Sequence, residues 1–275
     1  MANPVSLVST HEEPPAGSSL SAARLFVIPH AGGSASYYRG WSRWLPDTVE
    51  LVPLDLPGHA TRTGEPLVAE WQHLVDDLTG LVRTRLSGTY VLAGHSLGAL
   101  LAYEVARTMD ARGTPPSLLV ASGRNGPAAG LSHRPIHQLP DDQFLGTLER
   151  LGGMPRSVAE QADLMRTYLP LLRADLRLAE TYTRMPGPPL SSPVAVFAGR
   201  QDLLTDSRGL IAWSRETTGT FDLTVVEGGH FFHDEPSFAR AARAALGRLG
   251  LEEDRRCRGC GARPARSGTS SADPE

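Results

Sequence analysis

Short apolar runs recur along the chain, and most of them are bounded by Gly or Pro. Within each run the apolar residues are continuous and do not alternate with polar ones, which is typical of strands covered on both faces of a sheet. We therefore predict buried strands at residues 25–28, 51–54, 90–93, 118–121, 194–198 and 223–226.

Helical periodicity fills the intervals between these runs. Apolar residues at offsets of 0, 3, 4, 8 and 12 from Leu97 form one face of a helix that Gly113 is placed to end. Similar faces occur at residues 71–82 and 238–251. Strands that alternate with helices predict an α/β fold, with a mostly parallel central sheet flanked by helices.

One connection is longer than a simple crossover requires. Ala121 and Val194 lie 73 positions apart, whereas parallel strands need a crossover of about a dozen residues. The interval holds helical patterns at about 141–151 and 159–182. We predict an insertion at about 125–189, which either forms a helical lid over the carboxyl edge of the sheet or packs as ordinary helices.

The composition excludes several classes of function. The 275 residues carry 27 basic and 30 acidic side chains, so no net positive field gathers nucleic acid or an anionic membrane. No apolar run approaches the roughly 18 residues of a membrane span. All the basic side chains apart from histidine are Arg, which excludes Schiff-base chemistry on a lysine.

The chain ends differ from the body. We predict a flexible leader at residues 1–20, one α/β domain at 21–251 and a disordered tail at 252–275. Cys257 and Cys260 in that tail have the spacing of a zinc knuckle, but no second ligand pair follows, so we expect no metal site. A body without cysteine suits a reducing cytoplasm, where we expect the protein to act.

Residues 94–98, Gly-His-Ser-Leu-Gly, carry the strongest chemical signal. They form a Gly-x-Ser-x-Gly pentapeptide between a predicted strand and a predicted helix, which is the context of a nucleophile elbow. Ser96 then projects from a strained turn above the sheet. Gly94 and Gly98 are expected because strand and helix pass too closely there for side chains.

A serine nucleophile requires a base, and the base requires an acid that orients it. Asp202 and His230 follow the last two predicted strands, in the order Ser, acid, His that this elbow predicts. Their rivals are Asp206, which is placed to cap a helix near residue 207, and His233, which falls in or near the next helix. We interpret His95 as a packing residue.

The oxyanion of a tetrahedral intermediate requires backbone N–H donors. One donor is expected at Leu97, directly after the nucleophile. The other is expected in residues 29–34, Pro-His-Ala-Gly-Gly-Ser, which follow the first predicted strand. We select Ala31, with Gly32 as the alternative.

With these segments in place, the chain resembles the type II thioesterases, stand-alone editing enzymes of nonribosomal peptide and polyketide assembly lines with an α/β-hydrolase fold. The resemblance extends over residues 24–249. It rests on the segments 29–34 (PHAGGS), 55–59 (DLPGH), 94–98 (GHSLG), 139–145 (LPDDQFL), 151–155 (LGGMP), 169–175 (LPLLRAD) and 228–232 (GGHFF).

The resemblance implies hydrolysis of acyl groups stranded on the phosphopantetheine thiol of acyl or peptidyl carrier proteins. It assigns the nucleophile, acid and base to Ser96, Asp202 and His230, the residues already selected. It implies no metal and no bound cofactor, because phosphopantetheine enters as part of the substrate. Apolar lid residues either line a channel for that arm or pack the lid: Phe144, Leu145, Met165 and Tyr168, with Leu148, Leu164 and Leu172 beside them.

Two other functions stay open on the sequence. A general esterase, or a medium-chain fatty acyl-carrier or acyl-CoA hydrolase, uses the same three residues. A catalytically silent chaperone that binds carrier proteins is the second, although an intact Ser-Asp-His set argues against it. We expect the protein to bind neither nucleic acids nor membranes.

Overall fold

The computed structural model describes residues 23–154 and 161–251, so the predicted leader, tail and cysteine pair lie outside the described residues. Their sheet has six strands, all parallel, in the order β2-β1-β3-β4-β5-β6. The α/β-hydrolase architecture with a parallel sheet is thereby confirmed. The strands are β1 (Ala23–Ile28), β2 (Val49–Pro53), β3 (Thr89–His95), β4 (Leu118–Ser122), β5 (Val194–Gly199) and β6 (Phe221–Val226).

Alternate residues of the central strands enter two different apolar cores, because successive side chains of a strand point to opposite faces. In β1, Phe26 and Ile28 pack on the face covered by α2 (Trp71–Thr84) and α3 (Leu97–Asp110). Leu25 and Val27 pack on the other face. Burial on both faces explains why the strands are continuous apolar runs.

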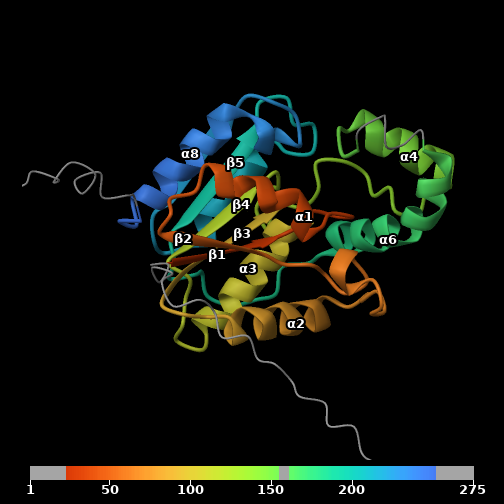
Figure 1. The fold of residues 1–275 in the computed structure, drawn as a ribbon. Coiled ribbons are helices and arrows are strands. Elements are labelled where there is room, and N and C mark those ends of the chain that lie inside the picture. Colours follow the sequence, from red (N-terminus) through yellow and green to blue (C-terminus); the bar gives the residue numbers. More distant parts are fainter. Residues whose placement is uncertain (1–22, 155–160, 252–275) are drawn as a thin grey trace, which may run out of the picture.

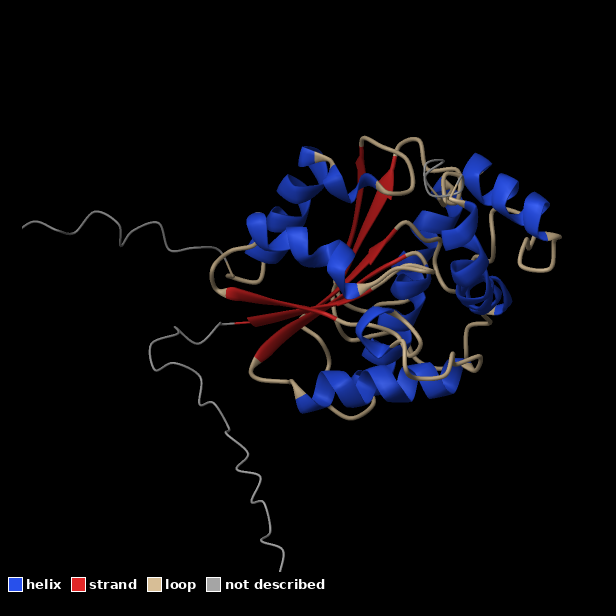
Figure 2. Cartoon of the chain, turned by 45° about the vertical axis from the view of Figure 1, so that its right-hand side comes forward, coloured by secondary structure: helices blue, strands red, loops and turns tan. Residues whose placement is uncertain are grey.

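The second face is covered from both ends of the chain. Helix α1 (Ala35–Tyr38) and the 3₁₀ turn η1 (Arg39–Arg43) lie there with α8 (Pro236–Gly247). Figure 2 shows the sheet between the two helical layers. The shorter elements are η2 (Ala60–Arg62), α7 (Ser207–Ala212), η3 (Trp213–Arg215) and η4 (Phe232–Asp234).

The long connection adds two helices beyond those that cover the sheet. Helices α4 (Asp141–Arg150) and α6 (Ala162–Thr181) lie beside each other (Figure 1), and the second half of α6 also packs on α3 and α2 through Leu178 and Ala179. They enclose a third apolar cluster, which includes Phe144 and Leu172. Both interpretations of the insertion keep support, because α4 and the first half of α6 form their own cluster, as a lid would, whereas the second half of α6 packs on the body.

No helix in residues 23–154 or 161–251 is both long and apolar enough to cross a bilayer.

The carboxyl ends of the parallel strands share one edge of the sheet. The loops after β1, β2, β3, β5 and β6 therefore converge there, and these loops carry the candidate chemistry.

Candidate active site

Ser96 occupies the turn between β3 and α3 in a conformation that few non-glycine residues adopt. Its φ is 55° and its ψ is −114°, a strained geometry that costs about 1–3 kcal/mol. A Cβ at Gly94 would overlap the carbonyl oxygen of Gly98, and a Cβ at Gly98 would overlap the carbonyl oxygen of Ile28. Both glycines are therefore required by the close approach of α3 to β3 and β1.

Asp202 and His230 form a buried pair in the loops after β5 and β6. The Nδ1 atom of His230 lies 3.1 Å from each carboxylate oxygen of Asp202. The carboxylate also accepts a hydrogen bond from the N–H of Leu204. Because a carboxylate accepts and Nδ1 must donate, the Nε2 atom of His230 is left as the basic nitrogen.

The elbow that carries Ser96 approaches this pair through His95. The ring of His95, directly before Ser96, lies 4.6 Å from the ring of His230 between centroids. Ser96 itself lines a small cavity of about 30 Å³, which lid residues Leu148 and Leu176 close from the other side. The candidate nucleophile thus lies beneath the lid, and the residue before it in the elbow contacts the candidate base.

Two backbone N–H groups remain for an oxyanion. Leu97 is the first residue of α3, where N–H groups have no acceptor within the helix. In the loop after β1, the N–H of Gly32 donates to Asp175 and that of Gly33 donates to the carbonyl of His30. Of residues 31–33, Ala31 therefore keeps its N–H for a substrate, which favours it over Gly32.

Ser122 also contacts histidines, but its environment does not suit a nucleophile. It is buried at the end of β4, and its hydroxyl donates to the carbonyl of Gly94. His95 Nδ1 and His233 Nε2 lie 3.0 and 3.2 Å from its oxygen. Since that hydrogen is already donated, both imidazoles are donors to Ser122, and neither is free to remove its proton.

Three imidazoles near the site are held neutral, of which His95 and His233 are buried, whereas His30 is half-buried and lines the cavity of about 510 Å³. Burial, followed by neighbouring histidines, holds the pKa of His95 and of His233 well below the usual value. Burial and then His230 lower the pKa of His30 to about 3. These residues contribute packing and hydrogen bonds instead of acid–base catalysis, as we predicted for His95.

Asp206, the rival acid, caps α7. Its carboxylate accepts from the N–H of Gly209 at 2.8 Å and from the side-chain amide of Asn125. This N-cap position agrees with the sequence. The carboxylate is therefore committed to the helix, whereas that of Asp202 faces His230.

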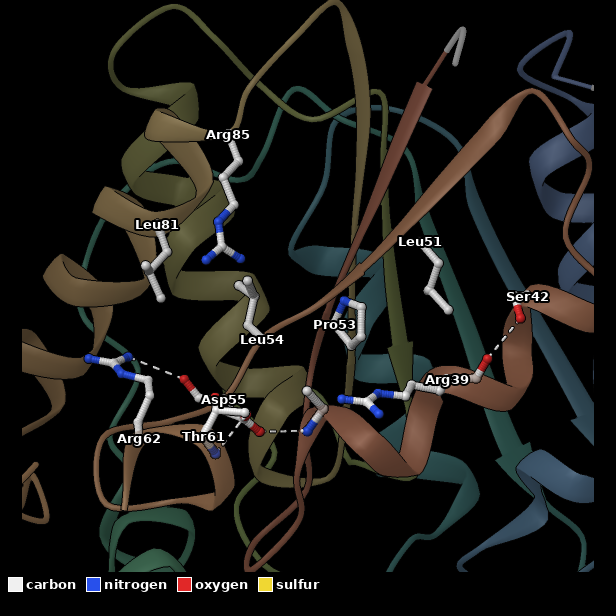
Figure 3. A pocket seen from close by; sticks show the side chains of 11 residues that line it. Arg39, Ser42, Leu51, Pro53, Leu54, Asp55, Thr61, Arg62, Leu81 and Arg85 are labelled. Atoms are coloured by element: carbon white, nitrogen blue, oxygen red, sulfur yellow. Dashed lines mark hydrogen bonds between the residues drawn. The ribbon is translucent and has the colours of Figure 1, made fainter. Parts of the chain in front are cut away.

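A second loop, after β2, supports the oxyanion loop from behind. The carboxylate of Asp55 accepts from the N–H of Ala35 at 2.7 Å and from the hydroxyl of Thr61 at 2.6 Å, as Figure 3 shows beside a cavity of about 580 Å³. That cavity lies over β2 and α2, and the side chains that line it include none of the candidate catalytic residues.

The proposed channel residues divide into two groups. Phe144 and Met165 are buried in the apolar cluster of the lid, and Leu145 packs against that cluster. Tyr168 also packs against the cluster, but it lines a cavity of about 510 Å³ together with Ala31 of the oxyanion loop. The geometry supports a channel position for Tyr168 and a packing role for the other three.

Two buried residues near the site were named above only as parts of the segments on which the family resemblance rests. Asp175 of α6 and His59 after β2 are both buried and hydrogen-bonded to each other. Asp175 is the single acidic residue of the stretch 171–178, whose other residues are apolar or Arg, and this was the signal that could have identified it. Within the described residues, no group of three or more His, Cys, Asp or Glu is placed to hold a metal ion.

Known proteins resemble this chain over most of its length. The thioesterase domain family model matches residues 23–246. The chain is 37% identical to thioesterase PikA5 of Streptomyces venezuelae over 214 residues, which are 77% of this chain and 76% of that protein.

Solved structures show the same likeness. The RedJ thioesterase from the prodiginine pathway of Streptomyces coelicolor is 37% identical, with a TM-score of 0.76 over 88% of this chain and 90% of that one. YbtT, a type II thioesterase from the yersiniabactin NRPS/PKS pathway, is 29% identical, with a TM-score of 0.73 over 86% and 94%.

Proposed function

Since this chain belongs to the thioesterase family, we propose that it is a type II thioesterase that removes stalled acyl groups from the phosphopantetheine arm of carrier proteins in nonribosomal peptide or polyketide biosynthesis. The observation that carries the proposal is the buried pair of Asp202 and His230, together with the strained turn of Ser96 whose neighbour His95 contacts His230. The names of the relatives supply the substrate class, because they belong to such pathways.

In the first half of the reaction, Ser96 is acylated. His230 Nε2 accepts the proton of the Ser96 hydroxyl as Oγ attacks the thioester carbonyl, and Asp202 stabilises the resulting imidazolium. The N–H groups of Leu97 and Ala31 hold the oxyanion. The carbon–sulfur bond then breaks, and His230 returns its proton to the leaving thiolate.

In the second half, water replaces the thiol. His230 removes a proton from water, the hydroxide attacks the acyl-serine, and the acid leaves as Ser96 regains its proton. The thiol is a good leaving group because its pKa is about 8.5, as for free Cys. The residues named supply every proton transfer, and the pantetheine arm arrives as part of the substrate.

The arm has a route past the oxyanion loop. The cavity of about 510 Å³ lined by Ala31 and Tyr168 adjoins the site from the lid side. We assign residues 21–251 as the catalytic unit, with the lid at about 125–189. Because the proposed substrates are carrier proteins of biosynthetic assembly lines, we also propose that the enzyme acts in the cytoplasm.

The proposal is tested by comparing three substrates at equal acyl group: an acyl-carrier protein, the acyl-CoA and a simple ester. We expect the highest kcat/KM on the carrier. Faster turnover of the free ester would overturn the assignment in favour of a general esterase, and faster turnover of acyl-CoA would favour an acyl-CoA hydrolase.

A fluorophosphonate probe tests the nucleophile separately. The intact chain should be labelled, and Ser96→Ala should lose both labelling and hydrolysis. Failure of the intact chain to be labelled would support a silent carrier-binding protein instead. The matched serine variant for this experiment is Ser122→Ala, which should keep the label.

A further inference from the structure

Asp175 contacts the oxyanion loop from the lid. It lies on α6 with only 3% of its surface exposed. Its Oδ2 atom accepts a hydrogen bond from the N–H of Gly32 at 2.7 Å and lies 2.9 Å from Nε2 of His59. One carboxylate oxygen of the lid therefore joins the loops that follow β1 and β2.

Gly32 is also held at its carbonyl. The hydroxyl of Tyr168, seven residues before Asp175 on α6, donates to the carbonyl oxygen of Gly32. Gly32 has a φ of +72°, and a Cβ there would overlap the Tyr168 hydroxyl. Both polar groups of this residue are thus bonded to one helix, and its neighbour Ala31 is the candidate oxyanion donor.

The partners of His59 define its protonation. Its Nδ1 atom lies 2.9 Å from the carbonyl oxygen of Pro57, which can only accept. Its Nε2 atom faces the carboxylate of Asp175, which accepts when ionised. Both ring nitrogens must then donate, so His59 is an imidazolium in a nearly closed site where only 3% of it is exposed.

The charges around His59 favour this state. Burial lowers its pKa, but the hydrogen bond and charge of Asp175, the carbonyl of Pro57 and the charge of Asp55 together raise the pKa above 6.5. Asp55 lies on the same loop and Asp175 comes from α6. Tyr168, the titratable neighbour of Asp175 on that helix, stays neutral because burial raises its pKa to about 12.

We propose that Asp175 and His59 are positioning residues, which act as a buried ion pair to hold Gly32 so that the N–H of Ala31 points at the substrate carbonyl. The inference rests on the proposed thioesterase function. Displacement of a reacting group by about 1 Å costs up to about 100-fold in rate, and an oxyanion donor is worth about 100-fold to 1,000-fold.

Two consequences follow for the variant Asp175→Asn. It keeps the shape of the side chain but removes the charge that retains the proton of His59. We expect kcat to fall at least about tenfold while KM changes less than about threefold, because only transition-state contacts are lost. Wild-type kcat should decline as pH rises through the raised pKa of His59, and this basic decline should be absent from the variant.

A buried carboxylate elsewhere provides the control. Glu216 is 2% exposed, binds Arg184 at 2.7 Å and accepts from Tyr103, away from the loops of the site. Glu216→Gln should lose stability but keep kcat and its pH profile. An equal fall of kcat in both variants would reduce the role of Asp175 to general stability and overturn the proposal.

A direct measurement does not depend on activity. ¹⁵N-edited NMR of the wild-type protein at pH 7 should show protons on both ring nitrogens of His59, and only one in Asp175→Asn. An unprotonated nitrogen in the wild type would overturn the ion pair. Tyr168→Phe is the second variant, and its kcat should also fall with KM retained.

The outcomes separate this inference from the proposed function. If the wild type fails to hydrolyse acyl-carrier thioesters, the proposed function is wrong, whatever the NMR spectra show of His59. If the wild type is active and Asp175→Asn keeps kcat within about twofold, the thioesterase assignment stands and the positioning role is wrong.

Discussion

Asp202 and His230 are 28 residues apart in the sequence, and in the fold both carboxylate oxygens of Asp202 lie 3.1 Å from Nδ1 of His230. The strands before them, β5 and β6, are neighbours in the sheet. Because parallel strands end at the same edge, the loop after each strand delivers one member of the pair. Both side chains are almost completely buried, so the orientation of the imidazole is fixed before substrate arrives.

Asp202→Asn should reduce kcat about 10,000-fold, because an amide in this position favours the wrong tautomer of His230. KM should change little, since the substrate does not contact Asp202. The matched control is Asp206→Asn, four residues away, where Asn caps α7 as well as Asp does. Steady-state kinetics on an acyl-carrier protein measures both. A large loss of kcat in the control instead would identify Asp206 as the acid.

Ser122→Ala should destabilise the fold without removing the nucleophile. The two imidazoles that donate to Ser122 would lose their acceptor, which costs about 1–3 kcal/mol for each buried group left unpaired. Urea denaturation measures this loss, and fluorophosphonate labelling should persist. Loss of labelling in a folded Ser122→Ala would contradict the assignment of Ser96.

Gly98→Ala should lower the thermal stability, because its Cβ would overlap the backbone carbonyls of Ile28 and Pro29. Overpacking of this kind costs about 1–3 kcal/mol. Gly80→Ala in α2 is the matched control, since no atom lies within 4 Å of a Cβ there. It should gain up to about 1 kcal/mol from helix propensity. A calorimetric melting temperature that falls equally in both variants would refute the close approach at the elbow.

The protein should become less stable as the pH falls below about 6.5. Folding keeps His30, His95 and His233 neutral, with the pKa of His30 lowered to about 3 and the others well below normal. The unfolded chain takes up protons at these residues near pH 6.5. The free energy of unfolding should therefore fall by up to about 1.4 kcal/mol per pH unit for each.

His59 does not oppose this slope. Its pKa is raised by folding, so its contribution is complete below pH 6.5 and is lost only as the pH rises. Urea titrations between pH 6.5 and 5 on the wild type and His30→Gln measure the effect. In the variant, the free energy of unfolding should fall less steeply with decreasing pH, by the contribution of one proton. An unchanged slope would contradict the neutral state of His30.

Much of the fold follows from local patterns. All six predicted strands and the faces of α2 and α3 are confirmed, because continuous apolar runs and helical offsets are properties of neighbouring residues. Boundaries were less accurate. β6 begins two residues before the predicted run, and α8 begins at Pro236 and ends at Gly247, with the proline in its first turn.

The candidate site likewise combines residues that local patterns identified with contacts that only the fold reveals. Ser96, Asp202 and His230 were selected because each follows a strand, and the rule that parallel strands end at one edge needs no coordinates. By contrast, the bond between Asp175 and Gly32 joins residues 143 positions apart. The packing of Phe144 and Met165 inside the lid likewise depends on how α4 meets α6.

The sequence by itself determined the sheet, the elbow and the chain order of the catalytic groups, because these depend on local periodicity and on strand topology. Only the tertiary structure decided that the lid holds the oxyanion loop through Asp175 and His59, and that Gly32 is thereby withdrawn as a donor. Such pairings depend on the docking of one element on another, which is set by the sum of many distant contacts and leaves no periodic trace in the sequence.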